Sequence, residues 1–131
     1  MRYLGIDYGS KWIGIAVSDE EGKIAFPRER IVGRPVRGVI GILKKIIHNE
    51  GIQKVIIGLP LSFASMDTRQ TVEVRAFAEM LSHEVQLPIE FQNEVLSSRA
   101  VERNGIEKTR VDSAAAALIL QSYIDRKKQE A

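Results

Sequence analysis

Hydrophobic residues in the first third of the chain fall into short runs that are typical of β-strands. These runs predict strands over three ranges: Tyr3–Asp7, Trp12–Ser18 and Ile24–Val32. The connections between them, Tyr8–Lys11 and Asp19–Lys23, are short and rich in turn residues. Because connections this short join antiparallel neighbours, we expect a three-stranded meander at the N-terminus.

Further along the chain, helical spacing of apolar residues alternates with short apolar strands. The pattern predicts helices over Gly38–Asn49, Thr71–His83, Leu96–Arg103 and Val111–Lys127, and strands over Lys54–Ile57 and Pro88–Gln92. The polar stretch 62–69 is expected to be a mobile loop. A meander followed by alternating helices and strands predicts an α/β fold with a mixed sheet. With 131 residues, the chain is expected to form one domain, 1–131, with about 126–131 as a frayed tail.

Asp7 stands out because it occupies a position where a core strand normally carries an apolar side chain. Alternation places it on one face of the first strand with Tyr3 and Gly5, and the next strand matches this face with Gly14 and Ala16. Such small side chains let another element pack close to the backbone. The last helix is the expected partner, because one stripe along it carries Asp112, Ala115, Ala116, Ile119 and Tyr123.

Asp7, Glu94 and Asp112 are the candidate catalytic residues, because two strand ends and a helix start could bring their carboxylates together. Crowded carboxylates repel one another and take up protons unless a cation lies between them. Mg²⁺ and Mn²⁺ suit oxygen ligands and can also hold phosphate oxygens. Two such ions about 3.5–4 Å apart can stabilise both the attacking and the leaving oxygen of an in-line displacement. The three acids are therefore predicted metal ligands, with Asp7 as the bridging one.

Each acid also has a purely structural interpretation. Asp7 could cap the turn that follows it through an Asx-type hydrogen bond. Glu94 could be an ordinary solvated glutamate. Asp112 completes a capping box that begins at Thr109, with a favourable charge near the helix N-terminus. Spacing alone leaves these alternatives open.

Composition narrows the setting without identifying a partner. Nineteen Lys and Arg against seventeen Asp and Glu give a net charge of +2, which is compatible with nucleic acid but too small to argue for it. The absence of cysteine excludes disulfides and thiolate metal sites. No apolar run approaches the ~18 residues of a membrane span, and no leader precedes the first strand. We therefore expect a cytoplasmic protein without a membrane partner, as a monomer or homodimer.

Five segments carry a family resemblance: "YLGIDYGSKWIGIAVSD", "VIIGLPLS", "VRAFAEML", "NEVLSSRAV" and "KTRVDSAAAALILQSYID". From residue 1 to about 126 the chain resembles the YqgF family of Holliday-junction-resolvase-like proteins, also described as pre-16S rRNA nucleases. The resemblance implies an RNase H-like fold with sheet order 3-2-1-4-5 and an antiparallel second strand. It also implies metal-dependent hydrolysis of the 5′ region of the 16S rRNA precursor. The family's acidic set corresponds to Asp7, Glu94 and Asp112.

The chain departs from the family pattern at three positions that bear on substrate and rate. Asn93 replaces an aspartate but keeps an oxygen ligand, and Val95 replaces an arginine that could meet phosphate. Trp12 stands where an arginine is common; its ring could stack on an unpaired base or simply pack against the strands.

Basic residues near the acids are the expected nucleic-acid contacts, although each could be only a solvated surface charge. They are Lys11, Arg69, Arg75, Arg99 and Lys108. The leading hypothesis is a nuclease acting on structured or precursor rRNA, or on branched DNA. A non-catalytic adaptor is the main alternative. An ATP-handling enzyme is a third, because the first motif also resembles a phosphate motif of the actin and sugar kinase group; that group needs two such domains.

Overall fold

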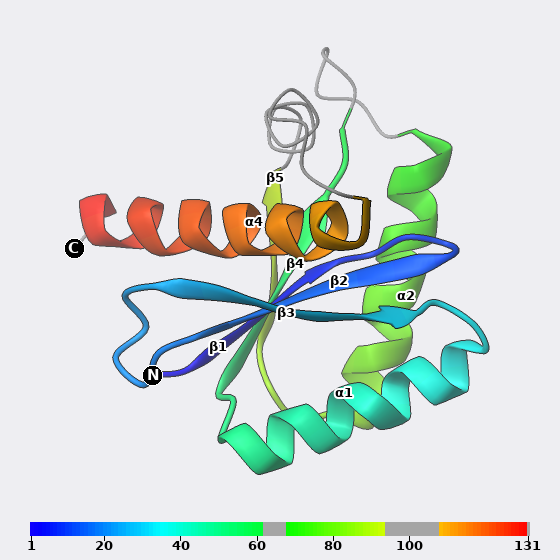
Figure 1. Cartoon of the computed structure of the whole chain (residues 1–131), viewed down its shortest axis with the longest axis horizontal. Helices are drawn as coiled ribbons and strands as arrows, with labels where there is room; N and C mark the ends of the chain where they lie inside the picture. The colour runs from blue at the N-terminus through cyan, green and yellow to red at the C-terminus, as the bar shows by residue number, and fades with distance from the viewer. Residues whose placement is uncertain (62–67, 94–107, 131) are drawn as a thin grey trace.

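The computed structural model of the chain describes residues 1–61, 68–93 and 108–130, the side chains of 108–112 excepted. The strands form one five-stranded sheet (Figure 1), and their bounds are β1 Tyr3–Asp7, β2 Trp12–Ser18, β3 Ala25–Val32, β4 Lys54–Leu59 and β5 Ile89–Asn93. The sheet order is β3-β2-β1-β4-β5. β2 runs antiparallel to both of its neighbours, whereas β1, β4 and β5 are parallel. The strand order and the antiparallel second strand confirm the sequence prediction.

Helices cover both faces of this sheet (Figure 1). α1 (Val36–Glu50) and α2 (Arg69–Glu84) pack on one face, and α4 (Lys108–Glu130) crosses the other. We call these the α1/α2 face and the α4 face. None of the helices in the described ranges is both long and apolar enough to span a membrane. The helix expected over Leu96–Arg103 lies outside the described residues.

The start of α2 differs from the prediction for a local reason. We expected the helix from Thr71, after a loop that reached residue 69. Instead Thr68 is the N-cap: its hydroxyl accepts a hydrogen bond from the Thr71 backbone N–H, and the Thr71 hydroxyl accepts one from the Thr68 N–H. This reciprocal capping box begins the helix at Arg69 and satisfies the backbone N–H groups of Thr68 and Thr71.

α4 is longer than predicted at both ends. It begins at Lys108, so Thr109 lies within the first turn and is not the N-cap, which corrects the capping box expected for Asp112. It ends at Glu130 rather than Lys127. Arg126 belongs to the segment expected to fray, yet its Nε donates to Gln92 Oε1 of β5 at 3.2 Å. Contact with the sheet therefore accompanies the extra helical turn.

Two hydrophobic clusters lie on the two faces of the sheet. The larger cluster joins aliphatic side chains of the sheet to α1 and α2, including Leu4 and Ile6 of β1. The smaller cluster joins Ala16 and Ile56 to α4. At Gly5 a Cβ atom would lie 2.8 Å from the Cβ of Leu120, so only glycine lets α4 approach this closely. This contact confirms the predicted packing of α4 on the face with small side chains.

β3 is an edge strand with an irregular pairing to β2. The register shifts between the pairs Ile13–Ile31 and Ile15–Arg28, so two β3 residues, Glu29 and Arg30, lie opposite Gly14. This is a β-bulge, which bends and twists the strand that contains the extra residue.

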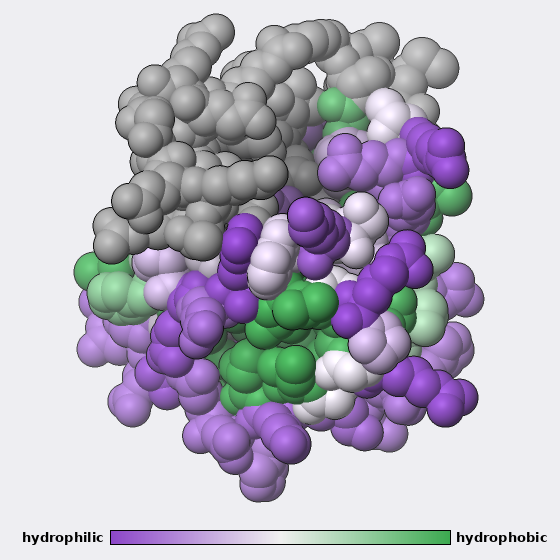
Figure 2. Space-filling view, turned by 45° about the vertical axis from the view of Figure 1, so that its right-hand side comes forward, coloured by the Kyte–Doolittle hydropathy of each residue, from purple (hydrophilic) through white to green (hydrophobic). Residues whose placement is uncertain are grey.

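Hydrophilic side chains cover most of the described surface seen in Figure 2, and hydrophobic side chains gather in its lower half.

Candidate functional site

Asp7 is the last residue of β1, in the middle strand of the sheet, and its side chain is half-buried. Leu4 and Ile6 point into the larger cluster, so alternation turns Asp7 toward the α4 face. Its partner on β2 is Gly14, which adds no side chain to this face. The predicted placement of Asp7 among small residues is therefore confirmed.

The turn after Asp7 is tightly packed and fixes the end of β1. At Gly9 a Cβ atom would lie 2.5 Å from the Trp12 carbonyl oxygen, so a larger residue would push the turn open. The Gly33 N–H donates to the Lys11 carbonyl at 2.9 Å. Tyr8 stacks on Phe77 of α2, with ring centroids 4.5 Å apart. These contacts hold the backbone on both sides of the Asp7 carboxylate.

The beginning of α4 lies over the same end of the sheet. Ser113 is buried, and its hydroxyl accepts a hydrogen bond from the Ile15 N–H at 3.5 Å. Ile15 follows Gly14, the cross-strand partner of Asp7. Asp112 precedes Ser113 in the helix, so its backbone lies near the part of β2 that pairs with Asp7. The side chain of Asp112 is outside the described part of the chain.

Glu94 also lies outside the described residues and directly follows β5 in sequence. β5 and β1 run parallel on either side of β4, so their carboxyl ends lie at one edge of the sheet. Asn93 ends β5, and alternation groups it with Ile89 and Phe91 on the α1/α2 face. The oxygen expected of Asn93 is thus on the face opposite to Asp7. The joint site of the three acids stays a prediction.

The five basic candidates occupy different surroundings. Lys11 is exposed in the turn that follows Asp7. Arg69 begins α2, is 96% exposed and lies 3.9 Å from Glu73, and Arg75 lies over the Phe91 ring at 5.7 Å. α2 packs on the face opposite to Asp7. Among the candidates with described side chains, Lys11 is the one closest to Asp7 in sequence. Lys108 begins α4, with its side chain outside the description, and Arg99 lies outside it entirely.

Sequence reasoning missed Arg30. Its guanidinium carbon lies 3.5 Å from the centroid of the Trp12 ring, which is a close cation–π contact. Regular alternation along β3 gives no warning of this contact, because the bulge at Glu29 and Arg30 changes which way these side chains point. Only the pairing of β2 with β3 reveals it.

A different polar group occupies the far end of the α4 face. Lys54 Nζ donates to the Tyr123 hydroxyl at 2.6 Å and lies 3.8 Å from Glu90, which is 3.6 Å from Arg126. Burial, together with the nearby Glu90 carboxylate, raises the pKa of Tyr123 to about 12. Lys54 begins β4, so this group lies at the opposite end of the parallel strands from Asp7. We call Lys54, Glu90, Tyr123 and Arg126 the Tyr123 cluster.

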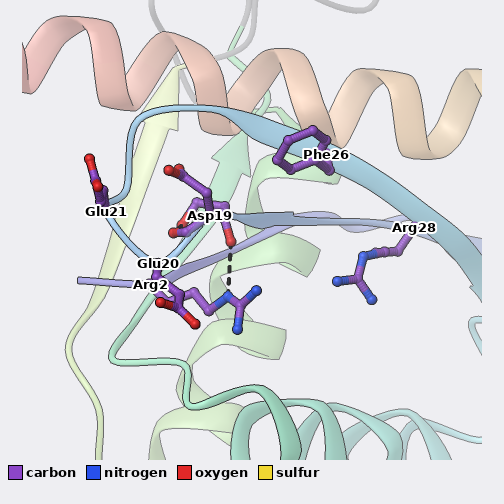
Figure 3. Close-up of a pocket in the computed structure, with 7 residues that line it drawn as sticks. Arg2, Asp19, Glu20, Glu21, Phe26 and Arg28 are labelled. Atoms are coloured by element: carbon purple, nitrogen blue, oxygen red, sulfur yellow. Dashed lines mark hydrogen bonds between the residues drawn. The ribbon is translucent and has the colours of Figure 1, made fainter.

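A shallow pocket near the N-terminus contains none of the predicted site residues (Figure 3). Its lining comprises Arg2, Ser18, Asp19, Glu20, Glu21, Phe26 and Arg28. Arg2 Nε donates to the Ser18 carbonyl at 3.0 Å. The Asp19 carboxylate accepts from the Lys23 and Ile24 N–H groups, which lowers its pKa. These groups hold the turn between β2 and β3 together, and we assign them a structural role.

Two solved Holliday junction resolvases share the fold of this chain. RuvC of Thermus thermophilus, solved in complex with a Holliday junction substrate, is similar with a TM-score of 0.66 over 98% of this chain and 96% of that chain, at 14% identity. The Fowlpox virus resolvase, solved with Holliday junction DNA, is similar with a TM-score of 0.61 over 97% and 99%, at 11% identity. At such low identity these likenesses show a shared RNase H-like fold.

Sequence comparison gives the particular family. The chain belongs to the RuvX family, described as Holliday junction resolvase, which matches residues 1–126. A relative from Lawsonia intracellularis is 36% identical over 99% of this chain and 97% of its own length. One from Maridesulfovibrio salexigens is 39% identical over 96% and 99%. Both are named "Putative pre-16S rRNA nuclease". The family resemblance read from the sequence is confirmed.

Proposed function

We propose that this protein is a metal-dependent nuclease that hydrolyses phosphodiester bonds in the 5′ region of precursor 16S rRNA. One observation carries the proposal: Asp7 ends the central strand opposite Gly14, which has no side chain, and the first turns of α4 lie over the same end of the sheet. The names of the relatives support the choice of substrate. Family membership supports nuclease chemistry.

The described part of the site contains one of the ligands that we propose for a divalent cation. A half-buried carboxylate at a strand end offers the hard oxygen ligand that Mg²⁺ and Mn²⁺ prefer, and its cross-strand partner Gly14 has no side chain. Glu94 and Asp112 are the further ligands that we propose from sequence. When bound, the metal supplies positive charge that stabilises the developing negative charge on the phosphate oxygens and the leaving group.

The contribution of the chain is to hold these groups in place before the reaction. Antiparallel pairing with Gly14 and the packed glycine turn fix the backbone of Asp7, so its carboxylate needs little reorganisation during the reaction. Lys11 lies in the turn that follows Asp7, and we propose that it neutralises a phosphate next to the cleaved bond.

The test is cleavage of a precursor rRNA fragment that spans the 5′ end of 16S rRNA. We expect cleavage in Mg²⁺ or Mn²⁺ that stops in chelator and is restored by excess metal. Asp7→Asn should lower the rate at least about 1,000-fold, because a ligand to the metal is lost. Asp125→Asn is the matched control, since Asp125 is exposed near the far end of α4.

An Asp7→Asn protein that is folded and as active as the control would exclude this mechanism. A four-way DNA junction serves as a second substrate, because the family description names Holliday junction resolution. Faster cleavage of the junction than of the RNA would reassign the substrate while retaining the metal chemistry. Binding of RNA without cleavage, unchanged by Asp7→Asn, would favour an adaptor.

A further inference from the structure

Trp12, Arg30 and Val32 form a small surface next to Asp7. Trp12 shares the α4 face of β2 with Gly14 and Ala16, since the residues between them point into the larger cluster. Trp12 lies two residues from Gly14, the partner of Asp7, or about 7 Å along the strand. Val32 is the cross-strand partner of Trp12. These three residues, which we call the Trp12 surface, therefore extend the Asp7 face toward the β3 edge.

The Trp12 surface combines an aromatic ring, a cation and exposed apolar area. The Arg30 guanidinium lies 3.5 Å from the centre of the half-buried Trp12 ring. Val32 is 57% exposed although it is a large apolar residue. Lys11, which precedes Trp12, and Arg34, which follows the strand, are exposed and add positive charge at the same end of the sheet.

We propose that the Trp12 surface binds an unpaired strand of the nucleic-acid substrate beside Asp7. This inference deepens the proposed function and rests on it for the identity of the substrate. Base stacking on aromatic side chains is tolerant of sequence, and it requires a base that is not held within a duplex. A guanidinium carries five N–H donors, so one that is stacked on a ring can bind a phosphate oxygen in addition to other partners. Trp12 and Val32 thus contact a base, and Arg30 contacts the phosphate attached to it.

The bulge in β3 gives a structural reason for this arrangement. With regular alternation along β3, Arg30 would point away from Trp12. The extra residue of the bulge reverses the alternation and places Arg30 over the Trp12 ring. Bulges commonly re-aim a side chain next to an active site. A purely structural pair would stabilise the sheet edge without affecting the binding of nucleic acid, and the experiment separates the two roles.

Trp12 is the only tryptophan of the chain, so its fluorescence reports on this surface alone. The full chain carrying Asp7→Asn is titrated in chelator with a single-stranded RNA of about twelve nucleotides, and separately with the same sequence as a blunt duplex. We expect saturable quenching by the single strand and at least about tenfold weaker quenching by the duplex. Fluorescence anisotropy of labelled RNA gives affinities for the variants that lack the ring.

Trp12→Ala and Arg30→Ala should each weaken binding of the single strand about 5- to 100-fold, the range expected for one stacked base. Trp12→Phe should retain most of the affinity. Phe26→Ala is the matched control, because Phe26 lies on β3 with Arg30, is 49% exposed and points to the α1/α2 face. Absence of saturable quenching, equal quenching by the duplex, or equal affinities for Trp12→Ala and Phe26→Ala would overturn the proposal. This experiment measures binding and not cleavage. Failure of the binding proposal can therefore be distinguished from failure of the proposed nuclease activity.

Discussion

The two ends of the α4 face contain different kinds of residue. At the Asp7 end, glycine and alanine surround a carboxylate at the end of a central strand. At the other end, Tyr123 is 1% exposed, and its ring packs edge to face with the Tyr3 ring, with the ring centroids 5.6 Å apart. There the charges of Lys54, Glu90 and Arg126 lie within 4 Å of an opposite charge.

This difference suggests that the two ends of the α4 face have different roles, one in stability and the other in catalysis. The Tyr123 cluster joins three elements, α4, β4 and β5, through one hydrogen bond and two ion pairs, as in a structural contact. At the Asp7 end, a half-buried carboxylate lies opposite Gly14, and we propose a metal site there. We therefore expect changes at the first end to affect unfolding and changes at the second to affect catalysis.

The largest expected effect on stability comes from Tyr123→Ala. Removing a buried aromatic ring should lower the free energy of unfolding by about 3–5 kcal/mol, measured by urea denaturation. Asp7→Ala should change it by less than about 1 kcal/mol while abolishing cleavage. The comparison fails if Tyr123→Ala keeps its stability, or if Asp7→Ala unfolds the protein.

The next largest effect tests the close approach of α4 with one chemical change at two places. Gly5→Ala puts a methyl group 2.8 Å from Leu120 Cβ and should destabilise by about 1–3 kcal/mol. Gly41→Ala adds the same methyl group in α1, where nothing lies within 4 Å, and should stabilise by about 1 kcal/mol. Thermal unfolding followed by circular dichroism measures both. Shifts of the same sign would show that space above Gly5 does not limit packing.

The third prediction uses pH. Folding raises the pKa of Tyr123 from about 10 to about 12, so the folded state favours the neutral hydroxyl. The stabilisation is complete below pH 10 and is lost as pH rises from about 10 to 12, because the unfolded chain loses its proton first. Urea midpoints at pH 9, 10 and 11 should fall more steeply for the wild type than for Tyr123→Phe. Parallel curves would contradict the shifted hydroxyl.

The smallest effect is expected for Arg126→Ala. Its side chain is 42% exposed and lies 3.6 Å from Glu90, so the ion pair is screened and should contribute less than about 1 kcal/mol. The loss should shrink further in 1 M salt, and cleavage should be unaffected. A loss as large as that of Tyr123→Ala would mean that the charges, and not the buried ring, dominate this end of the face.

Alternation was sufficient to predict the face with small side chains, because that face follows from local periodicity. The strand order was predicted only by the family resemblance. Alternation also placed Asp7 correctly. It did not predict the start of α2, where the pair Thr68 and Thr71 forms the cap. Nor did it predict the last turn of α4, where Arg126 contacts Gln92 of a strand distant in sequence. Non-local pairing is invisible in a local pattern, and the bulge that directs Arg30 onto Trp12 is a second example.

The outer strand β3 explains why the sheet stops where it does. An edge strand offers its unpaired backbone groups to any chain that could add a further strand. Here the edge contains Pro27, which has no N–H to donate, followed by the charged residues Arg28, Glu29 and Arg30. The bulge at Glu29 and Arg30 breaks the regular ladder. A neighbouring molecule would find no regular register on this side. The irregularity that serves Trp12 therefore also protects the protein against growth into aggregates by strand addition.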